Sequence, residues 1–270
     1  MRIFLGPGGV PLTAPDRDTV SGIRQVSNLG LSAMEVEFVH GVRMGAGAAD
    51  EAGKAARELG VRLSVHAPYF INLCNPEKAG DSEKRILDSC EKAHLMGAGV
   101  VVFHPGFYGK LEKKDALGMV EKSCAGMASV IRERGWGVRL GLETTGKYSQ
   151  FGTVEEILEI CRKNRSCTPV VDWAHLFALH QGKPDFRGIM DSVTGAGHLK
   201  LHTHFSGINF TDKGERNHMA ISHKRPDFSV VARLILGSAL EEITLISESP
   251  ELEKDSLVMK KELERLGHVF

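Results

Sequence analysis

Six short apolar segments of the chain each end in a residue that can bind a metal ion. In chain order these residues are His66, His104, Glu143, Asp172, His204 and Glu248. No lysine or arginine stands at the six positions to balance the acids, and carboxylates packed together raise one another's pKa. A divalent cation relieves that repulsion, and mixed nitrogen and oxygen ligands suit zinc, manganese or iron better than magnesium or calcium. The pattern predicts a metal site.

Two further histidines lie close to these positions. His175 follows Asp172 by three residues, one helical turn, so both side chains can face the same site. His202 shares a strand face with His204 but lies deeper, so it is either a support for the ligands or a core residue. One histidine or acid at a strand end is most often only a polar residue leaving the core. The repetition on six successive segments is what favours a metal site.

The apolar segments alternate with longer amphipathic stretches, and this alternation predicts a parallel sheet with helices outside it. Thr153 and Glu156 fit a capping box at one helix start. We expect strands at residues 2–5, 33–39, 62–66, 100–104, 139–143, 169–172, 198–204 and 244–248. We expect helices near residues 18–29, 48–59, 82–97, 113–134, 153–163, 186–194, 228–237 and 252–266.

Eight strand–helix pairs in 270 residues predict one α/β domain over residues 1–270, a (β/α)8 TIM barrel. The carboxyl ends of its strands would converge on one mouth and bring the six polar residues together. The alternative is an open doubly wound sheet, but no GxGxxG follows the first strand. Gly6, Gly8 and Gly9 are expected to form a tight turn.

The composition is that of an ordinary globular protein, with 42% hydrophobic and 25% charged residues. Lysine plus arginine and aspartate plus glutamate both number 34, which excludes a uniformly basic nucleic-acid coat but leaves room for a local basic patch. Five cysteines without a CxxC motif indicate reduced thiols, so we expect a cytoplasmic protein. The sequence has no run of 18 apolar residues, and we expect no membrane segment.

Several short motifs at these positions resemble those of the endonuclease IV family of apurinic/apyrimidinic endonucleases, within the wider xylose-isomerase-like barrels. Their order and spacing match that family over residues 66 to 250, nearly the whole barrel. The motifs are His66-Ala-Pro-Tyr69 with Asn72, His104-Pro-Gly106, Glu143-Thr-Thr-Gly146, Asp172-Trp-Ala-His175 and Glu248-Ser-Pro250.

The resemblance implies two or three zinc ions, with Mn²⁺ or Fe²⁺ as other possibilities. Glu143 would bridge metals and orient the nucleophile, and Tyr69 would wedge into DNA beside the abasic sugar. The family has Asp-Arg-His after strand seven, and the nearest segment here is Glu215-Arg216-Asn217-His218. Because of this departure, the sequence does not decide whether a third metal ion is bound. Arg216 is then the best candidate for a phosphate contact. The implied ligands are His66, His104, Glu143, Asp172, His175, His204, Glu248, Glu215 and His218.

The activity that the resemblance implies is incision of damaged double-stranded DNA on the 5′ side of an abasic site. We also expect a monomer. The alternative is a sugar isomerase or epimerase with one metal, for which Glu143, Asp172, His204 and Glu248 fit the ligand pattern. The additional histidines of the chain favour the nuclease. A third alternative is a catalytically silent barrel that binds metal or nucleic acid.

Overall fold

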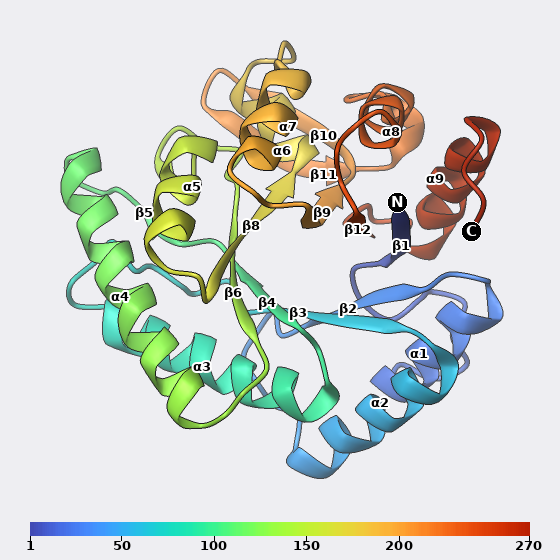
Figure 1. The fold of residues 1–270 in the computed structure, drawn as a ribbon, viewed down its shortest axis with the longest axis horizontal. Coiled ribbons are helices and arrows are strands. Elements are labelled where there is room, and N and C mark those ends of the chain that lie inside the picture. The colour runs from blue at the N-terminus through green and yellow to red at the C-terminus, as the bar shows by residue number, and fades with distance from the viewer.

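The computed structural model describes residues 1–270 and contains one sheet of eight parallel strands (Figure 1). The strands are β1 (Arg2–Pro7), β2 (Ala33–Glu37), β3 (Arg62–His66), β4 (Val100–Phe103), β6 (Arg139–Glu143), β8 (Cys167–Asp172), β9 (Lys200–Phe205) and β12 (Glu242–Ser247). Their spatial order is β1-β12-β9-β8-β6-β4-β3-β2, in which consecutive parallel strands are neighbours. All eight expected strands are confirmed, with ends that differ by a few residues.

The barrel closes between β1 and β2. The Ser32 amide donates to the Leu5 carbonyl at 3.0 Å, and the Gly9 amide donates to the Glu35 carbonyl at 2.9 Å. Gly6 lies at the closest approach, where an added Cβ would stand 1.6 Å from the Ala33 carbonyl oxygen. The tight turn expected from the glycine-rich segment is therefore wrong for Gly6, which is part of β1. Position 6 requires glycine because the backbone of Ala33 on the neighbouring strand approaches it closely.

We predict that Gly6→Ala destabilises the protein by at least about 3 kcal/mol, because the Ala33 backbone cannot move away without opening the seam. The free energy of unfolding in urea measures this change. Gly118→Ala is the matched control, because Gly118 is at an exposed position of a helix and an added Cβ there meets nothing within 4 Å. The control should gain about 1 kcal/mol from helix propensity. Equal stabilities of the two variants would contradict the role of Gly6.

Helices cover the outside of the barrel (Figure 1). The capping box is confirmed, since the Thr153 hydroxyl accepts from the Glu156 amide and the Glu156 carboxylate accepts from the Thr153 amide. None of the helices combines the length and the apolar character needed to cross a membrane. The helices are α1 (Thr19–Asn28), α2 (Ala46–Leu59), α3 (Ala79–Met96), α4 (Lys113–Glu133), α5 (Val154–Lys163), α6 (Trp173–Leu179), α7 (Phe186–Gly195), α8 (Phe228–Leu236) and α9 (Glu253–Arg265).

Two antiparallel strand pairs lie outside the barrel, and neither was expected from the sequence. Strand β5 (Gly106–Phe107) pairs with β7 (Gln150–Phe151), and β10 (Gly207–Thr211) pairs with β11 (Gly214–Met219) in a hairpin. The hairpin docks on the loop after β6, where the Glu215 amide donates to the Gly146 carbonyl at 2.8 Å. Gly214 has a φ of +99°, and an added Cβ there would stand 2.2 Å from that carbonyl oxygen.

Candidate metal centre

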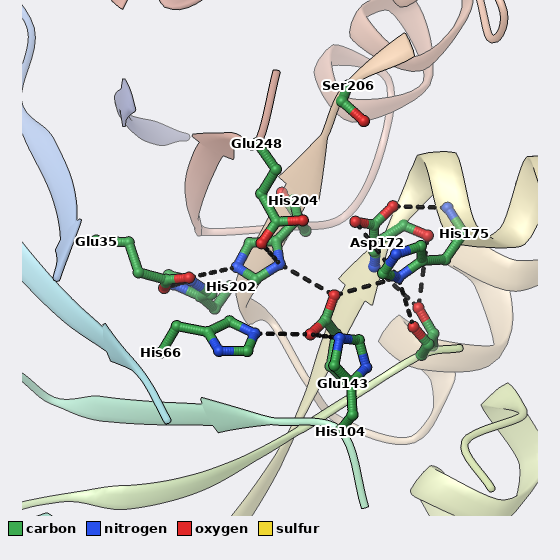
Figure 2. A network of polar contacts seen from close by, with 12 residues as sticks. Glu35, His66, His104, Glu143, Asp172, His175, His202, His204, Ser206 and Glu248 are labelled. Atoms are coloured by element: carbon green, nitrogen blue, oxygen red, sulfur yellow. Dashed lines mark hydrogen bonds and ion pairs between the residues drawn. The ribbon is translucent and has the colours of Figure 1, made fainter. Parts of the chain in front are cut away.

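The side chains at the strand ends converge on Glu143, which is fully buried at the end of β6 (Figure 2). Its Oε2 lies 3.2 Å from His66 Nε2 and 3.3 Å from His104 Nε2. Its Oε1 lies 3.2 Å from His175 Nδ1 and 3.2 Å from His204 Nδ1. One carboxylate from β6 is thus surrounded by imidazoles from four other segments, as the barrel prediction required.

Asp172 and His175 are brought together by the start of α6. Asp172 ends β8 and caps α6, so its Oδ1 accepts from the His175 amide at 2.7 Å. Its Oδ2 is buried and has no hydrogen-bond partner. Buried carboxylate oxygens rarely lack a partner, and a ligand oxygen facing a cation is one physical reason for it. The three-residue spacing therefore places one predicted ligand at the end of the strand and the other on the first turn of the helix.

The predicted ligands form three groups in which the donor atoms lie within 4.8 Å of one another. No lysine or arginine nitrogen lies within 4 Å of the carboxylates of Glu143, Asp172 or Glu248, so the acids have only histidines as positive partners. This donor set fits divalent ions of the zinc type. The groups are His66 with His104 and Glu143; Glu143 with Asp172, His204 and Glu248; and His175 with His218 and Glu248.

A β-bulge in the hairpin explains the departure from the family's Asp-Arg-His. Phe210 pairs with Glu215 but Asn209 pairs with Asn217, so Arg216 is the extra residue. The bulge turns Glu215 and His218 to the same side, and both line the mouth cavity. Glu215 Oε2 lies 3.5 Å from His175 Nε2. Arg216 is exposed and does not line the cavity.

Three of the histidines have one ring nitrogen fixed by a neighbouring group. The Ala67 carbonyl lies 2.8 Å from His66 Nδ1, and the Thr144 carbonyl lies 3.0 Å from His175 Nδ1. The Ser206 hydroxyl lies 2.7 Å from His218 Nδ1. A nitrogen that faces a carbonyl carries the hydrogen, so Nε2 of His66 and His175 is left as the free donor to the site.

The electrostatics of the site differ from the simple expectation of mutually raised carboxylate pKa values. Burial raises the pKa of Glu143, but the surrounding histidines, His104 and His204 foremost, outweigh it and hold that pKa well below its ordinary value. Burial raises the pKa of Glu248 well above its ordinary value, and Glu143 adds to this rise. Burial lowers the pKa of His104 to about 4. The centre of the site is thus an ionised Glu143.

Two motif residues position the loops of the site. Gly106 has a φ of +134°, and an added Cβ would stand 2.3 Å from Asn72 Oδ1. That oxygen accepts from the amides of Phe107 and Cys74, each at 3.1 Å. The His104-Pro-Gly106 segment therefore packs directly on the loop that follows His66.

The mouth encloses a cavity of about 450 Å³. Tyr69 lies at its rim and is 60% exposed, and Lys147 also lines it. Sequence reasoning missed two acids of β2, Glu35 inside the barrel and Glu37 at the cavity. Burial, the largest influence on Glu37, raises its pKa to about 7. The signal was present, because acids two residues apart in an apolar strand point to one face.

Relatives of known sequence cover most of the chain. The model of the xylose isomerase-like TIM barrel family matches residues 23–267. An uncharacterized protein of Methanocaldococcus jannaschii is 31% identical over 273 residues, 97% of either chain. A probable endonuclease 4 of Mycoplasmopsis pulmonis is 29% identical over 202 residues, 71% of either chain.

Solved structures share the fold at low identity. Endonuclease IV from Thermus thermophilus has a TM-score of 0.76 and 18% identity, covering 98% of this chain and 100% of that one. A D-tagatose 3-epimerase-like protein has a TM-score of 0.73 and 18% identity, covering 98% and 96%. The resemblance read from the motifs is confirmed at the level of the family. This chain belongs to the xylose isomerase-like TIM barrel family.

Proposed function

We propose that the protein is a metal-dependent phosphodiesterase of the endonuclease IV type, which incises double-stranded DNA on the 5′ side of abasic sites. The observation that carries the proposal is the group of His175, His218 and Glu248 at the mouth, beside the groups that contain Glu143. Glu215 Oε2 lies 3.5 Å from His175 Nε2, next to this additional group. A single-metal sugar enzyme has no need of this additional group. The relatives named probable endonuclease 4 support the same activity.

The three groups of side chains would hold two or three zinc-like ions, with Mn²⁺ or Fe²⁺ as alternatives. Such ions, when bound, activate water and neutralise charge on a phosphodiester. Glu143 belongs to two of the groups, so it would fix their separation and orient the attacking water. The attacking water would give up a proton as its oxygen bonds to phosphorus. The bond from phosphorus to the 3′ oxygen would break, and that oxygen would take up a proton and leave as a hydroxyl.

The cavity and its rim fit a nucleotide that has lost its base. An abasic sugar has no base to unstack, so it enters a pocket at little cost, and the cavity of about 450 Å³ has room for it. Lys147 lines the cavity and would contact a backbone phosphate. Arg216 lies outside the cavity, where it would contact a phosphate farther along the strand. We also propose that the enzyme is cytoplasmic, since all five cysteines are free thiols, and that it acts as a monomer.

Tyr69→Ala is expected to lower kcat/KM for abasic duplex by about tenfold to 100-fold, since one aromatic stack on a base contributes ~1–3 kcal/mol. The ring is mostly exposed, so the free energy of unfolding should change by less than about 0.5 kcal/mol. Steady-state incision and urea unfolding measure the two quantities. Phe270→Ala, a 44% exposed aromatic at the carboxyl end, is the control and should leave both unchanged. An unchanged kcat/KM for Tyr69→Ala would remove it from the DNA contact.

The second candidate is an isomerase or epimerase that uses one metal. It is favoured by the group of Glu143, Asp172, His204 and Glu248, which could by itself hold one ion.

One experiment separates the two functions. Protein loaded with zinc, manganese or iron is incubated with a duplex that carries a single abasic analogue, and in parallel with a panel of ketoses. A single nick 5′ to the analogue, with two or three ions per chain, supports the nuclease. Ketose turnover without a nick, with one ion per chain, overturns it.

A further inference from the structure

We propose that Glu35 is a positioning residue that holds His204 so that Nδ1, and not Nε2, binds the metal ion. Glu35 lies in the middle of β2, across the barrel interior from β9, and is fully buried (Figure 2). This inference rests on the metal site of the proposed function but is independent of the DNA substrate.

The contacts of Glu35 divide between its two oxygens. Oε1 lies 2.9 Å from His204 Nε2. Oε2 lies 2.9 Å from His202 Nε2 and accepts from the Ser64 hydroxyl at 2.6 Å. Ser64 stands directly opposite Glu35 on the neighbouring strand. One oxygen is therefore saturated by partners that are not metal ligands, and the other is directed at His204.

The other face of His204 points to the metal site. Its Nδ1 lies 3.2 Å from Glu143 Oε1 and 3.1 Å from Glu248 Oε1. An imidazole that binds a metal through one nitrogen usually donates the other N–H to an acceptor, which sets the tautomer and the ring orientation. The contact of Glu35 Oε1 with His204 Nε2 is an ion pair outside hydrogen-bond geometry, and neither buried atom has a hydrogen-bond partner. A hydrogen on Nε2 would be held on that side by the charge of Glu35, which would leave Nδ1 as the donor to the metal.

Glu35 gives His204 a different support from the other histidines. His66 and His175 are held at Nδ1 by backbone carbonyls, so their free nitrogen is Nε2. His204 is held at Nε2 by a carboxylate, so its free nitrogen is Nδ1. A full negative charge at the remote nitrogen makes the imidazole a stronger donor than a carbonyl does. The cost of burying that charge is offset by two imidazoles and the Ser64 hydroxyl, because no lysine or arginine nitrogen lies within 4 Å of Glu35.

The contrary interpretation is that Glu35 is itself a ligand, since its oxygen and the nitrogens of His202 and His204 lie within 4.8 Å of one another. The Ser64 hydroxyl donates to the same oxygen that His202 contacts. Oε2 is therefore an acceptor already in use, which favours the positioning role, whereas Oε1 has no hydrogen-bond partner. The metal content of Glu35→Gln distinguishes the two roles, because loss of a ligand would release a whole ion.

The test measures metal binding and needs no substrate. Zinc affinity is determined by competition with a chelator for the wild type, Glu35→Gln and Glu35→Leu. We expect the affinity of the tightest affected site to fall about tenfold for glutamine, which keeps an acceptor, and about 100-fold for leucine. His202→Gln is the matched control, because it removes the other partner of Glu35 and should change the affinity by less than about threefold. Circular dichroism of the metal-free variants verifies that each still folds.

Nitrogen-15 NMR of the zinc-loaded wild type assigns the metal-bound nitrogen of His204, and Co²⁺ absorption reports a changed ligand geometry in the variants. Zinc on Nδ1 with the hydrogen on Nε2 is the expected result. Zinc on Nε2, or unchanged affinity for Glu35→Leu, overturns the proposal. Loss of one whole ion in Glu35→Gln overturns it in favour of a ligand role. A protein that gives the expected metal results but does not nick abasic DNA refutes the proposed function alone.

Discussion

Under the proposed function, Glu143→Gln should lower incision of an abasic duplex by at least about 1000-fold, because the ions that this carboxylate would share stabilise the transition state by several kcal/mol. Glutamine has nearly the same shape but only one acceptor oxygen and no charge. Both carboxylate oxygens of Glu143 face imidazoles: Oε2 lies 3.2 Å from His66 and Oε1 lies 3.2 Å from His204. The variant should therefore lose bound metal as well as rate. Single-turnover incision and mass-spectrometric metal content measure these two losses.

Glu58→Gln is the control for this experiment, since it makes the same chemical change at an exposed position of α2. It should keep full activity and full metal content. If Glu143→Gln kept both, Glu143 would have no place in the centre. If it lost the metal but kept the rate, the chemistry would lie elsewhere on the chain.

Metal affinity should fall steeply as the pH falls, by about tenfold per pH unit for each proton that the ion must displace. Burial lowers the pKa of His66, but Glu143 and Glu37 outweigh it and raise that pKa to about 10. Carboxylates also outweigh burial at His175 and His204 and hold their pKa values well above the ordinary value. Below its pKa a histidine is protonated, so at neutral pH each of the three carries a proton that competes with the metal.

Zinc affinity measured by chelator competition at about pH 6, 7 and 8 gives the change in log affinity per pH unit. Proton release in buffers of different ionisation enthalpy gives the number of protons that the ion displaces. His104 provides an internal comparison, because burial lowers its pKa to about 4 and it is already neutral over this range. His104→Asn should weaken binding without changing the slope, whereas His66→Asn should reduce the slope by about one proton. A wild-type affinity that does not vary with pH would contradict the charge assignment.

The barrel and most of the site could be predicted from the sequence because both depend on local patterns. Strand ends of a parallel barrel meet at one mouth whatever the loops do, so His66, His104 and Glu143 had to be neighbours. Helix α6 was missed because it starts directly at the end of β8, without a loop to mark it. The spacing of Glu35 and Glu37 marked one face of the strand, but the role of Glu35 depends on a partner across the barrel that the sequence does not show.

The hairpin could not be predicted for a different reason. Its strands are mostly polar, and its place depends on the contact of Gly214 with the Gly146 carbonyl, two residues far apart in the chain. The bulge at Arg216 depends on the pairing register, which no local pattern fixes. The sequence therefore shows that Glu215 and His218 depart from the family motif, but the positions of their side chains are known only from the structure.

The hairpin has a consequence for how sites of this kind diversify. The group of Glu143, Asp172, His204 and Glu248 is carried by the barrel framework, whereas Glu215 and His218 are carried by an appended ribbon. If both groups hold ions as proposed, shortening or reshaping that ribbon would alter the ion capacity of the centre and leave the framework intact. One scaffold can thus pass between chemistries through a change in a single peripheral insertion.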